Sequence, residues 1–167
     1  MSDWLGPFPI EAAHEIDTFD CGDEALNAYL KRFAAFNEAN RSARTFVVLA
    51  GTRVVGFFSL AAGSLQHAEA PERVGKGLAR HPIPIILLGR LAIDKSAQGQ
   101  GLGRALFKEA LKRSLAASEQ VGARAVVVHA KTDRAAETYR NWGMIPFPDQ
   151  PLILYVLMSE IERRMRR

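Results

Sequence analysis

The chain has 167 residues, of which 48% are hydrophobic and 24% are charged, and this composition excludes an intrinsically disordered protein. The length is enough for one domain with its own core and too short for two, so we predict a single domain over residues 1–167. The formal net charge of +4 favours acidic partners, such as the phosphates of a nucleotide or of a nucleic acid.

A single cysteine, Cys21, excludes an intrachain disulfide and a metal site built from thiolates, and it agrees with a reducing cytoplasm. No apolar run approaches the roughly 18 residues that a membrane-spanning helix needs. Residues 1–15 lack the basic region and hydrophobic stretch of a secretory signal. The sequence therefore predicts a cytoplasmic protein with no membrane contact and no metal.

The first predicted element is a helix over residues 20–40. Its apolar residues recur in three- and four-residue steps, which is typical of one buried helix face. These residues are Leu26, Tyr29, Leu30, Phe33 and Phe36. We expect the basic residues of this region to lie off that face; they are Lys31, Arg32 and Arg41.

A β-hairpin is predicted next, over residues 45–65, with its reversal at 50–53. Residues 66–82 are polar and rich in proline and glycine, so we expect a connection or a short irregular helix there. A long strand follows over 82–94. Gly89 in its interior predicts a bulge or a close approach of another chain segment.

The remaining elements alternate between helix and strand. The pattern predicts a helix over 101–121 that ends at Gly122, a strand over 123–129, a helix over 133–143 and a final strand over 151–159. The basic tail after these is expected to be a solvated helix end. This order predicts an α/β fold, a mixed central sheet with flanking helices and a right-handed crossover.

Residues 93–103 read IDKSAQGQGLG, a strand that runs into a glycine-rich turn and a helix. Glycines at 99, 101 and 103 allow the backbone to turn and to approach a ligand, and the helix start directs free N–H groups at one point. An anion is expected there, and Arg104 can add a positive charge. A dinucleotide-binding fingerprint would need glycine at position 104 and an acidic residue in place of His129 at the end of the next strand, so the sequence argues against it. A P-loop would need Gly-Lys-Ser/Thr after its first glycine, and none follows here.

The spacing of Gln98, Gly101 and Gly103 after a strand resembles the central motif of the GNAT acetyltransferase family. That resemblance implies the GNAT fold, with a central strand pair that splays apart near residues 89–91, and acetyl-CoA as the cosubstrate. Backbone groups of Ala92 and Ile93 would pair with the pantetheine arm, and the amides of residues 98–104 would hold the pyrophosphate. The implied cofactor-binding residues are Leu91, Ala92, Ile93, Gln98, Gly99, Gln100, Gly101, Leu102, Gly103, Arg104 and Asp133.

A second feature of the GNAT family is a helical tyrosine with glycine four residues later, here Tyr139 and Gly143. The resemblance makes Tyr139 the catalytic candidate, because a neutral phenol can donate the proton that the departing CoA thiolate needs. Thr132, Thr138 and Met144 stand where many members have asparagine, phenylalanine and phenylalanine.

The start of this helix and the general base are less well defined by the sequence. Asp133 is better placed than Thr132 to cap the helix. His129 is the nearest candidate base, although histidines at strand ends usually have a structural role. A site without a base favours an α-amino acceptor, whose pKa of about 7.7–8.0 leaves it partly neutral, over a lysine amine at about 10.4.

Within the GNAT family, residues 19–30, 54–71 and 82–94 are most similar to the toxins of bacterial toxin–antitoxin pairs, which acetylate the α-amino group of aminoacyl-tRNA and block translation. This resemblance implies aminoacyl-tRNA as substrate, a ribbon-helix-helix antitoxin and a homodimer. Candidate contacts to tRNA phosphates are Lys31, Arg32, Arg41, Arg44 and Arg90.

Two alternatives remain open from the sequence. One is a GNAT enzyme that acetylates a protein N-terminus, a polyamine or another small amine, and an acidic groove would favour it over tRNA. The other is a non-catalytic CoA-binding module that acts through a partner. An intact loop together with Tyr139 argues against the second.

Overall fold

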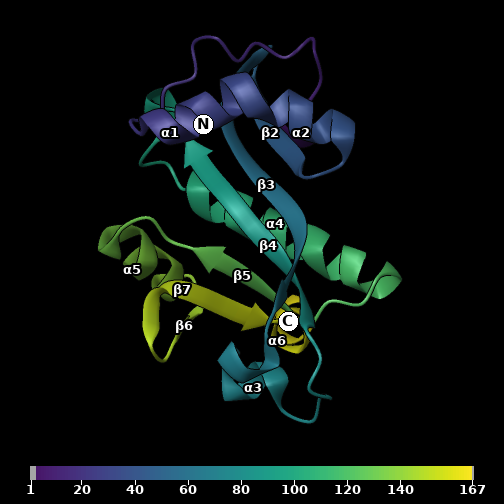
Figure 1. Ribbon diagram of the computed structural model, residues 1–167. Coiled ribbons are helices and arrows are strands. Elements are labelled where there is room, and N and C mark those ends of the chain that lie inside the picture. Colours follow the sequence, from purple (N-terminus) through teal and green to yellow (C-terminus); the bar gives the residue numbers. More distant parts are fainter. Residues whose placement is uncertain (1–2, 167) are drawn as a thin grey trace. The chain divides into compact units, whose positions relative to one another are not determined.

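The structure of the protein is a computed structural model that describes residues 3–166 (Figure 1). Its strands are β1 (Trp4–Pro9), β2 (Arg44–Ala50), β3 (Arg53–Leu65), β4 (Ile83–Ile93), β5 (Ala125–His129), β6 (Ile145–Phe147) and β7 (Gln150–Leu157). Its α-helices are α1 (Glu24–Ala28), α2 (Ala34–Asn40), α3 (Glu72–Gly75), α4 (Leu102–Gln120), α5 (Asp133–Asn141) and α6 (Met158–Met165). A π turn (Tyr29–Phe33) joins α1 to α2, and 3₁₀ turns lie at His67–Glu69 and Lys95–Ala97.

The strands of this described part form one sheet in the order β1-β2-β3-β4-β5-β7-β6. Strands β4 and β5 pair in parallel, whereas the β1–β2, β2–β3, β5–β7 and β6–β7 pairs are antiparallel. The sheet is therefore mixed, and the predicted α/β class with flanking helices is confirmed. The chain divides into two compact units, residues 1–61 with 89–110 and residues 62–88 with 111–167.

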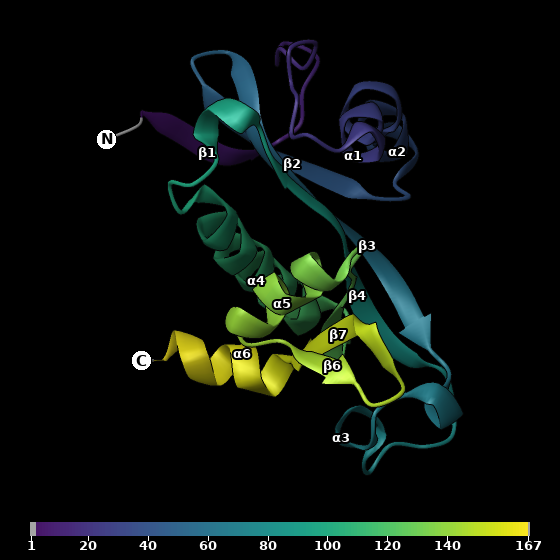
Figure 2. The same ribbon diagram turned by 90° about the vertical axis from the view of Figure 1, so that its left-hand side faces the viewer.

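The first unit is built on the predicted hairpin of β2 and β3, which pair from Arg44↔Leu60 to Ala50↔Arg53. The helical segment of residues 24–40 covers one face of this hairpin (Figure 2). Phe57 of β3 holds this core together, because its ring packs edge-to-face on Phe19 at 5.4 Å and stacks on Tyr29 at 6.2 Å. Aromatic pairs of this kind add to the burial of apolar area.

The prediction that Phe33 and Phe36 belong to the buried helix face is wrong. Their side chains are 52% and 68% exposed. The π turn inserts one extra residue into the helix, so the buried face continues from Leu30 to Ala34 instead of Phe33. Lys31 and Arg32 lie off the buried face as predicted, and both are exposed.

Strand β1 was not predicted, because prolines at 7 and 9 argue against a strand. It lies at the edge of the sheet, where a proline has no second neighbour to which it must donate a hydrogen bond. Its register against β2 shifts between Leu5 and Phe8. Edge position and irregular pairing together explain why the strand tolerates this sequence.

The second unit contains the first part of β4, together with β5, β7 and β6. Strands β4 and β5 pair in parallel over Ile86–Leu88 and Val126–Val128, and the splay near residues 89–91 stays a prediction. All five residues of β5 also pair with β7. The apolar core of this unit consists of Val74, Ile83, Ile85, Ala125, Val127, Phe147 and Tyr155. Strand β6 was not predicted, and the helix expected in the basic tail, α6, begins at Met158, inside the stretch predicted as the last strand.

Candidate active site

Strand β4 leads into the loop that the sequence singled out. Gly89 lies close to β3, because a Cβ at this position would be 3.0 Å from the Ser59 hydroxyl, so the predicted close approach is confirmed. Further along, Leu91 and Ile93 are half-buried and Ala92 is buried. These three residues form the end of a regular strand, as pairing with an extended ligand requires.

The glycine loop, residues 94–101, turns the chain from β4 into α4. Gly99 and Gly101 have φ of +74° and +84°, a left-handed conformation that costs other residues about 1–2 kcal/mol each. No atom lies within 4 Å of a Cβ built at either glycine, so backbone conformation and not crowding selects glycine here. Helix α4 begins at Leu102, and its first N–H groups, with those of Gly103 and the exposed Arg104, have no acceptor within the helix.

Gln98 has a structural role that its place in the motif did not reveal. Its side-chain Nε2 donates to the Ile93 carbonyl at 2.8 Å and to the Cys21 carbonyl at 3.0 Å. The Gln100 side chain likewise donates to the Ser96 carbonyl at 3.3 Å. These glutamine side chains hold the loop on the protein, so its backbone amides are the groups suited to a ligand.

Asp94 is the principal residue that sequence reasoning missed. One of its carboxylate oxygens accepts from the Asp20 N–H at 2.8 Å, and the other accepts from the Ser96 N–H at 3.0 Å and the Ser96 hydroxyl at 2.6 Å. Arg53 lies 3.5 Å away. Burial alone would raise the pKa of Asp94, but these hydrogen bonds and the Arg53 charge together lower it. An aspartate two residues before a serine at a strand end is a typical turn signal and could have identified it.

The segment of residues 19–22, which carries part of the resemblance to the toxins, forms a support for the glycine loop. The Asp20 carbonyl accepts from the Lys95 N–H at 2.8 Å, and its carboxylate lies 3.3 Å from Lys95 Nζ. The side chain of Asn27 and the N–H of Gly22 also donate to this carboxylate and lower the pKa of Asp20. Asn27 in turn accepts from the Cys21 N–H at 2.9 Å. The sequence of this segment is therefore explained by its contacts with the loop.

Tyr139 lies in the second unit, on α5. Its side chain is half-buried and packs edge-to-face on Trp142 at 5.7 Å. Burial raises the pKa of Tyr139 to about 12, so the phenol keeps its proton at neutral pH. A protonated phenol held in this way is suited to act as a general acid.

The prediction that Asp133 caps α5 is wrong. Thr132 is the N-cap, because it has extended backbone angles and its hydroxyl accepts from the Ala135 N–H at 3.1 Å. Asp133 is the first helical residue and is exposed, in the position where a negative charge favours the helix dipole. His129 is also exposed, at the end of β5.

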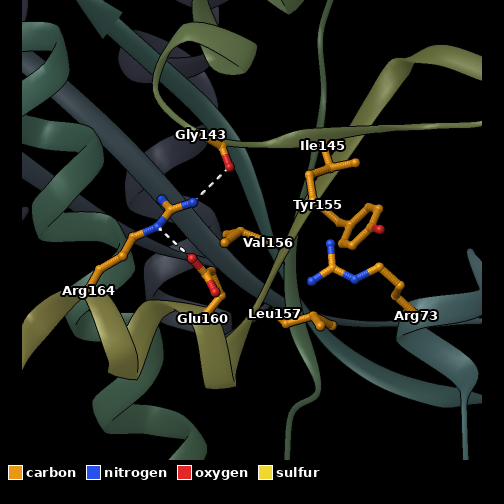
Figure 3. Close-up of a pocket in the computed structure, with 8 residues that line it drawn as sticks. All are labelled: Arg73, Gly143, Ile145, Tyr155, Val156, Leu157, Glu160 and Arg164. Carbon is orange, nitrogen blue, oxygen red and sulfur yellow. Dashed lines mark hydrogen bonds and ion pairs between the residues drawn. The ribbon is translucent and has the colours of Figure 1, made fainter.

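Gly143, four residues after Tyr139, leaves the space that the side chain of Arg164 on α6 occupies. Gly143 has φ of +98°, and a Cβ there would lie 2.7 Å from Arg164 Nη2. That nitrogen donates to the Gly143 carbonyl at 2.8 Å, while Arg164 Nε lies 3.6 Å from Glu160 (Figure 3). The sequence predicted that Arg164 is a solvated residue of the tail. The structure shows instead that it makes a specific contact with Gly143.

We expect Arg164→Met to loosen the end of α5 and to lower the free energy of unfolding by about 1–2 kcal/mol, because a charged hydrogen bond to the half-buried Gly143 carbonyl is lost. The kcat for acetyl transfer should fall more than the affinity for acetyl-CoA, since Tyr139 lies on this helix. Arg163→Met is the matched control: Arg163 pairs with the same Glu160 but its side chain is 64% exposed. Denaturant unfolding that ranks the two variants equally would contradict this role.

The five predicted phosphate contacts all lie in the first unit, the one that holds the glycine loop. Lys31, Arg32 and Arg41 are exposed. Arg44 forms an ion pair with Glu38. Arg90 is half-buried with its guanidinium 3.8 Å from the centre of the Tyr29 ring. The last two are therefore partly engaged by protein groups, whereas the first three face solvent.

The part of the chain that the structure describes lacks two features. Residues 3–166 contain no cluster of three or more His, Cys, Asp or Glu that could hold a metal ion. No helix in this range is long and apolar enough to cross a bilayer. Among the described residues, the glycine loop is suited to bind an anion such as a pyrophosphate and Tyr139 is suited to donate a proton, and both properties agree with the class of transferases that use a nucleotide-linked donor.

Comparison with known proteins agrees with this class. Residues 41–143 match the acetyltransferase (GNAT) domain family. The chain is 39% identical over 160 residues to a tRNA-acetylating toxin of Mycobacterium tuberculosis (strain ATCC 25618 / H37Rv), with 96% of each sequence covered. The protein therefore belongs to the GNAT family of acetyltransferases, as its sequence motifs predicted.

Solved structures of toxins are also similar. One is AtaT complexed with acetyl-methionyl-tRNAfMet, with a TM-score of 0.85, 30% identity and coverage of 93% of this chain and 94% of that chain. Another is a tyrosine-to-phenylalanine variant of the AtaT toxin bound to the C-terminus of the antitoxin AtaR and acetyl-CoA. Its TM-score is 0.80, with 28% identity and coverage of 99% of this chain and 97% of that chain.

As a GNAT acetyltransferase, the protein uses acetyl-CoA, and the described residues fit this donor. The positions in front of Gly99 and Gly101 are open, so a diphosphate can approach the backbone there. The start of α4 offers N–H groups and a positive dipole end to the same anion. Buried Ala92 and half-buried Ile93 form the strand end that is suited to an extended pantetheine arm.

Proposed function

We propose that this protein acetylates the α-amino group of aminoacyl-tRNA and acts as the toxin of a toxin–antitoxin pair, blocking translation. One observation is central to this proposal: the similarity to a protein named as a tRNA-acetylating toxin extends over nearly the whole of both chains. The similar AtaT structure holds an acetylated aminoacyl-tRNA, which supports the same class of acceptor. Lys31, Arg32 and Arg41, which face solvent in the first unit, agree with an RNA substrate.

The residues have distinct roles in the proposed mechanism. Acetyl-CoA supplies the acetyl group as a thioester. The amides of residues 98–104 hold its pyrophosphate, and the backbone of Leu91–Ile93 pairs with its pantetheine arm. The Tyr139 hydroxyl donates its proton to the sulfur as the carbon–sulfur bond breaks, while the attacking amine loses a proton to solvent. Asp133 does not need to touch the cofactor for any of these steps, although its charge lies at the start of the helix that carries Tyr139.

The proposal predicts the pH dependence of the reaction. Because the pKa of Tyr139 is raised to about 12, the phenol remains protonated at neutral and mildly alkaline pH. The only titration expected is that of the acceptor, so kcat/KM should rise with pH to a plateau above about pH 8, the pKa of an α-amino group. A profile measured with amide-linked aminoacyl-tRNA, which resists alkaline hydrolysis, checks this. A fall in rate between pH 8 and pH 10 would contradict Tyr139 as the acid.

The acceptor itself is tested by acetyl transfer from radiolabelled acetyl-CoA. We expect charged tRNA to be labelled and the same tRNA without its amino acid to remain unlabelled. A polyamine and a peptide with a free N-terminus are included in parallel. Equal labelling of charged and uncharged tRNA, or labelling of the small amines alone, would refute the proposal and favour another GNAT acceptor. Absence of any acetyl-CoA turnover would favour a non-catalytic binding module.

The proposal extends to assembly and location. We propose that the chain works as one acetyltransferase domain in the cytoplasm, as a homodimer neutralised by a ribbon-helix-helix antitoxin. The similar AtaT toxin bound to the C-terminus of its antitoxin supports an antitoxin partner. Light scattering of the purified toxin, alone and with the product of a neighbouring antitoxin gene, checks the dimer and the complex.

A further inference from the structure

Two large aromatic side chains of the helical segment 24–40 face solvent. Phe33 is 52% exposed and Phe36 is 68% exposed, and they are separated by one helical turn. The exposure of Phe33 follows from the π turn, which directs Ala34 to the core in its place. An isolated exposed apolar residue is ordinary, but two adjacent rings on one helix form a patch that indicates a binding function. We call Phe33 and Phe36 the aromatic patch.

Two cations lie next to the aromatic patch on the same helical segment. Lys31 and Arg32 directly precede Phe33, and Arg32 is one turn from Phe36 at the i,i+4 spacing. Neither takes part in an ion pair within residues 3–166. Between residues 29 and 41 the one carboxylate is Glu38, which pairs with Arg44. The patch is therefore both aromatic and positively charged.

The π turn, which carries Lys31, Arg32 and Phe33 and leads directly into the helix of Phe36, also contacts the strand that leads to the glycine loop. Arg90 of β4 places its guanidinium 3.8 Å from the centre of the Tyr29 ring, the first residue of the π turn. Leu91–Ile93, the proposed contacts of the pantetheine arm, follow Arg90 directly. Within this one unit, the aromatic patch thus lies on a segment packed beside the strand where the acetyl group would be delivered.

We propose that Phe33 and Phe36 form a stacking surface for the unpaired nucleobases at the 3′ end of the acceptor tRNA, with Lys31 and Arg32 neutralising its phosphates. This inference rests on the proposed function. Unpaired bases stack on aromatic side chains, and the cations match the backbone charge, so single-stranded RNA satisfies both parts of the patch. An apolar protein surface would cover the rings but would leave the neighbouring cations without partners.

The test compares two RNA hairpins with the tRNA acceptor stem, one with the unpaired 3′ end and one with a blunt end. Binding is measured with the full chain in the absence of acetyl-CoA. We expect the wild type to bind the hairpin with the unpaired end about tenfold more tightly or better. The double variant Phe33→Ala/Phe36→Ala should bind both hairpins equally, at the wild-type affinity for the blunt one.

Matched variants separate stacking from charge and from simple hydrophobicity. Phe33→Leu/Phe36→Leu keeps apolar side chains without rings and should behave like the alanine pair, whereas Phe33→Trp/Phe36→Trp should keep the preference. Lys31→Ala/Arg32→Ala should weaken binding of both hairpins alike. The slope of the logarithm of the binding constant against the logarithm of the salt concentration should fall in magnitude by about two. Affinity for acetyl-CoA serves as the folding control and should not change in any of these variants.

Several results would overturn the inference. In one such result, the wild type binds both hairpins equally; in another, the alanine or leucine variants without the two phenylalanines still prefer the unpaired 3′ end. Either result would rule out the stacking role and leave the proposed function intact. Variants that change only self-association or antitoxin binding would assign the patch to a protein partner. Failure of the wild type to bind either hairpin would count against both this inference and the proposed function, and the labelling of charged tRNA would then decide the latter alone.

Discussion

Replacing Tyr139 with phenylalanine is expected to lower kcat by about 10²- to 10⁴-fold, because the reaction loses the donor that protonates the leaving sulfur. The substitution keeps the ring and its contact with Trp142 at 5.7 Å, so the fold of α5 should be preserved. Affinity for acetyl-CoA should therefore stay within about twofold of wild type. Steady-state kinetics with charged tRNA and calorimetric binding of acetyl-CoA measure these two quantities separately.

Tyr155→Phe is the matched control for this experiment. Tyr155 is another tyrosine of the second unit, but it is buried in the core of β5 and β7 and lines the pocket beside Arg164. The kcat of the Tyr155→Phe variant should be close to that of wild type. If Tyr139→Phe lowers kcat no more than Tyr155→Phe does, the phenol of Tyr139 is not the acid and the assignment by motif fails.

Removal of the Asp94 carboxylate is expected to have the second large effect. Asp94→Ala leaves three donors and the Arg53 guanidinium without their acceptor, which should lower the free energy of unfolding by about 2–3 kcal/mol. The start of the glycine loop loses its side-chain contacts with Asp20 and with Arg53 of β3 at the same time. Affinity for acetyl-CoA should then fall about tenfold, since the loop amides are no longer held in place before binding. Chemical denaturation and calorimetry test the two effects.

The pH dependence of the free energy of unfolding separates the contribution of the Asp94 charge from that of its side-chain packing. Because the folded protein lowers the pKa of Asp94, ionisation stabilises the fold above the unfolded pKa of about 3.9, and this stabilisation is lost as the pH falls through the folded pKa. The stability difference between wild type and Asp94→Ala should therefore narrow in acid. Asp17→Ala removes an exposed carboxylate and should show no such loss. A difference that stays constant down to low pH would mean that lost packing, not lost charge, explains the effect.

The glycine loop was predictable because its sequence reports backbone conformation directly. Positive φ at Gly99 and Gly101 and the helix start at Leu102 follow from local rules that need no tertiary information. The support of the loop was not predictable in the same way. Asp20 and Asp94 are 74 positions apart in the sequence, and a hydrogen bond over that separation is determined by the fold.

The helical segment 24–40 shows where periodicity fails. The three- and four-residue steps assume a regular α-helix, and one π turn changes which residue faces the core. Ala34 replaces Phe33 in the core because of this single inserted residue. Nothing local marks the insertion, since both residues are compatible with either environment. The error is informative, because both rings that the periodicity placed on the buried face are exposed.

The Tyr139 region was predicted in type but not in detail. The spacing of Tyr139 and Gly143 identified the helix and its end, while the reason for the glycine is Arg164, which lies on a helix that the sequence did not separate from the last strand. The N-cap fell one residue from the prediction, at Thr132. Ser, Thr and Asp have similar capping preferences, so composition alone does not choose between neighbouring candidates.

The position of the transferred acetyl group tests the central claim most directly. After reaction of the wild-type protein with labelled acetyl-CoA and charged tRNA, mild base releases the amino acid, and mass spectrometry identifies it. Acetylation of aminoacyl-tRNA predicts that the label is recovered as the N-acetyl amino acid and that Tyr139→Phe yields almost none. Label that remains on the tRNA after the amino acid has been released, or that appears only on polyamines or peptides, would contradict the claim.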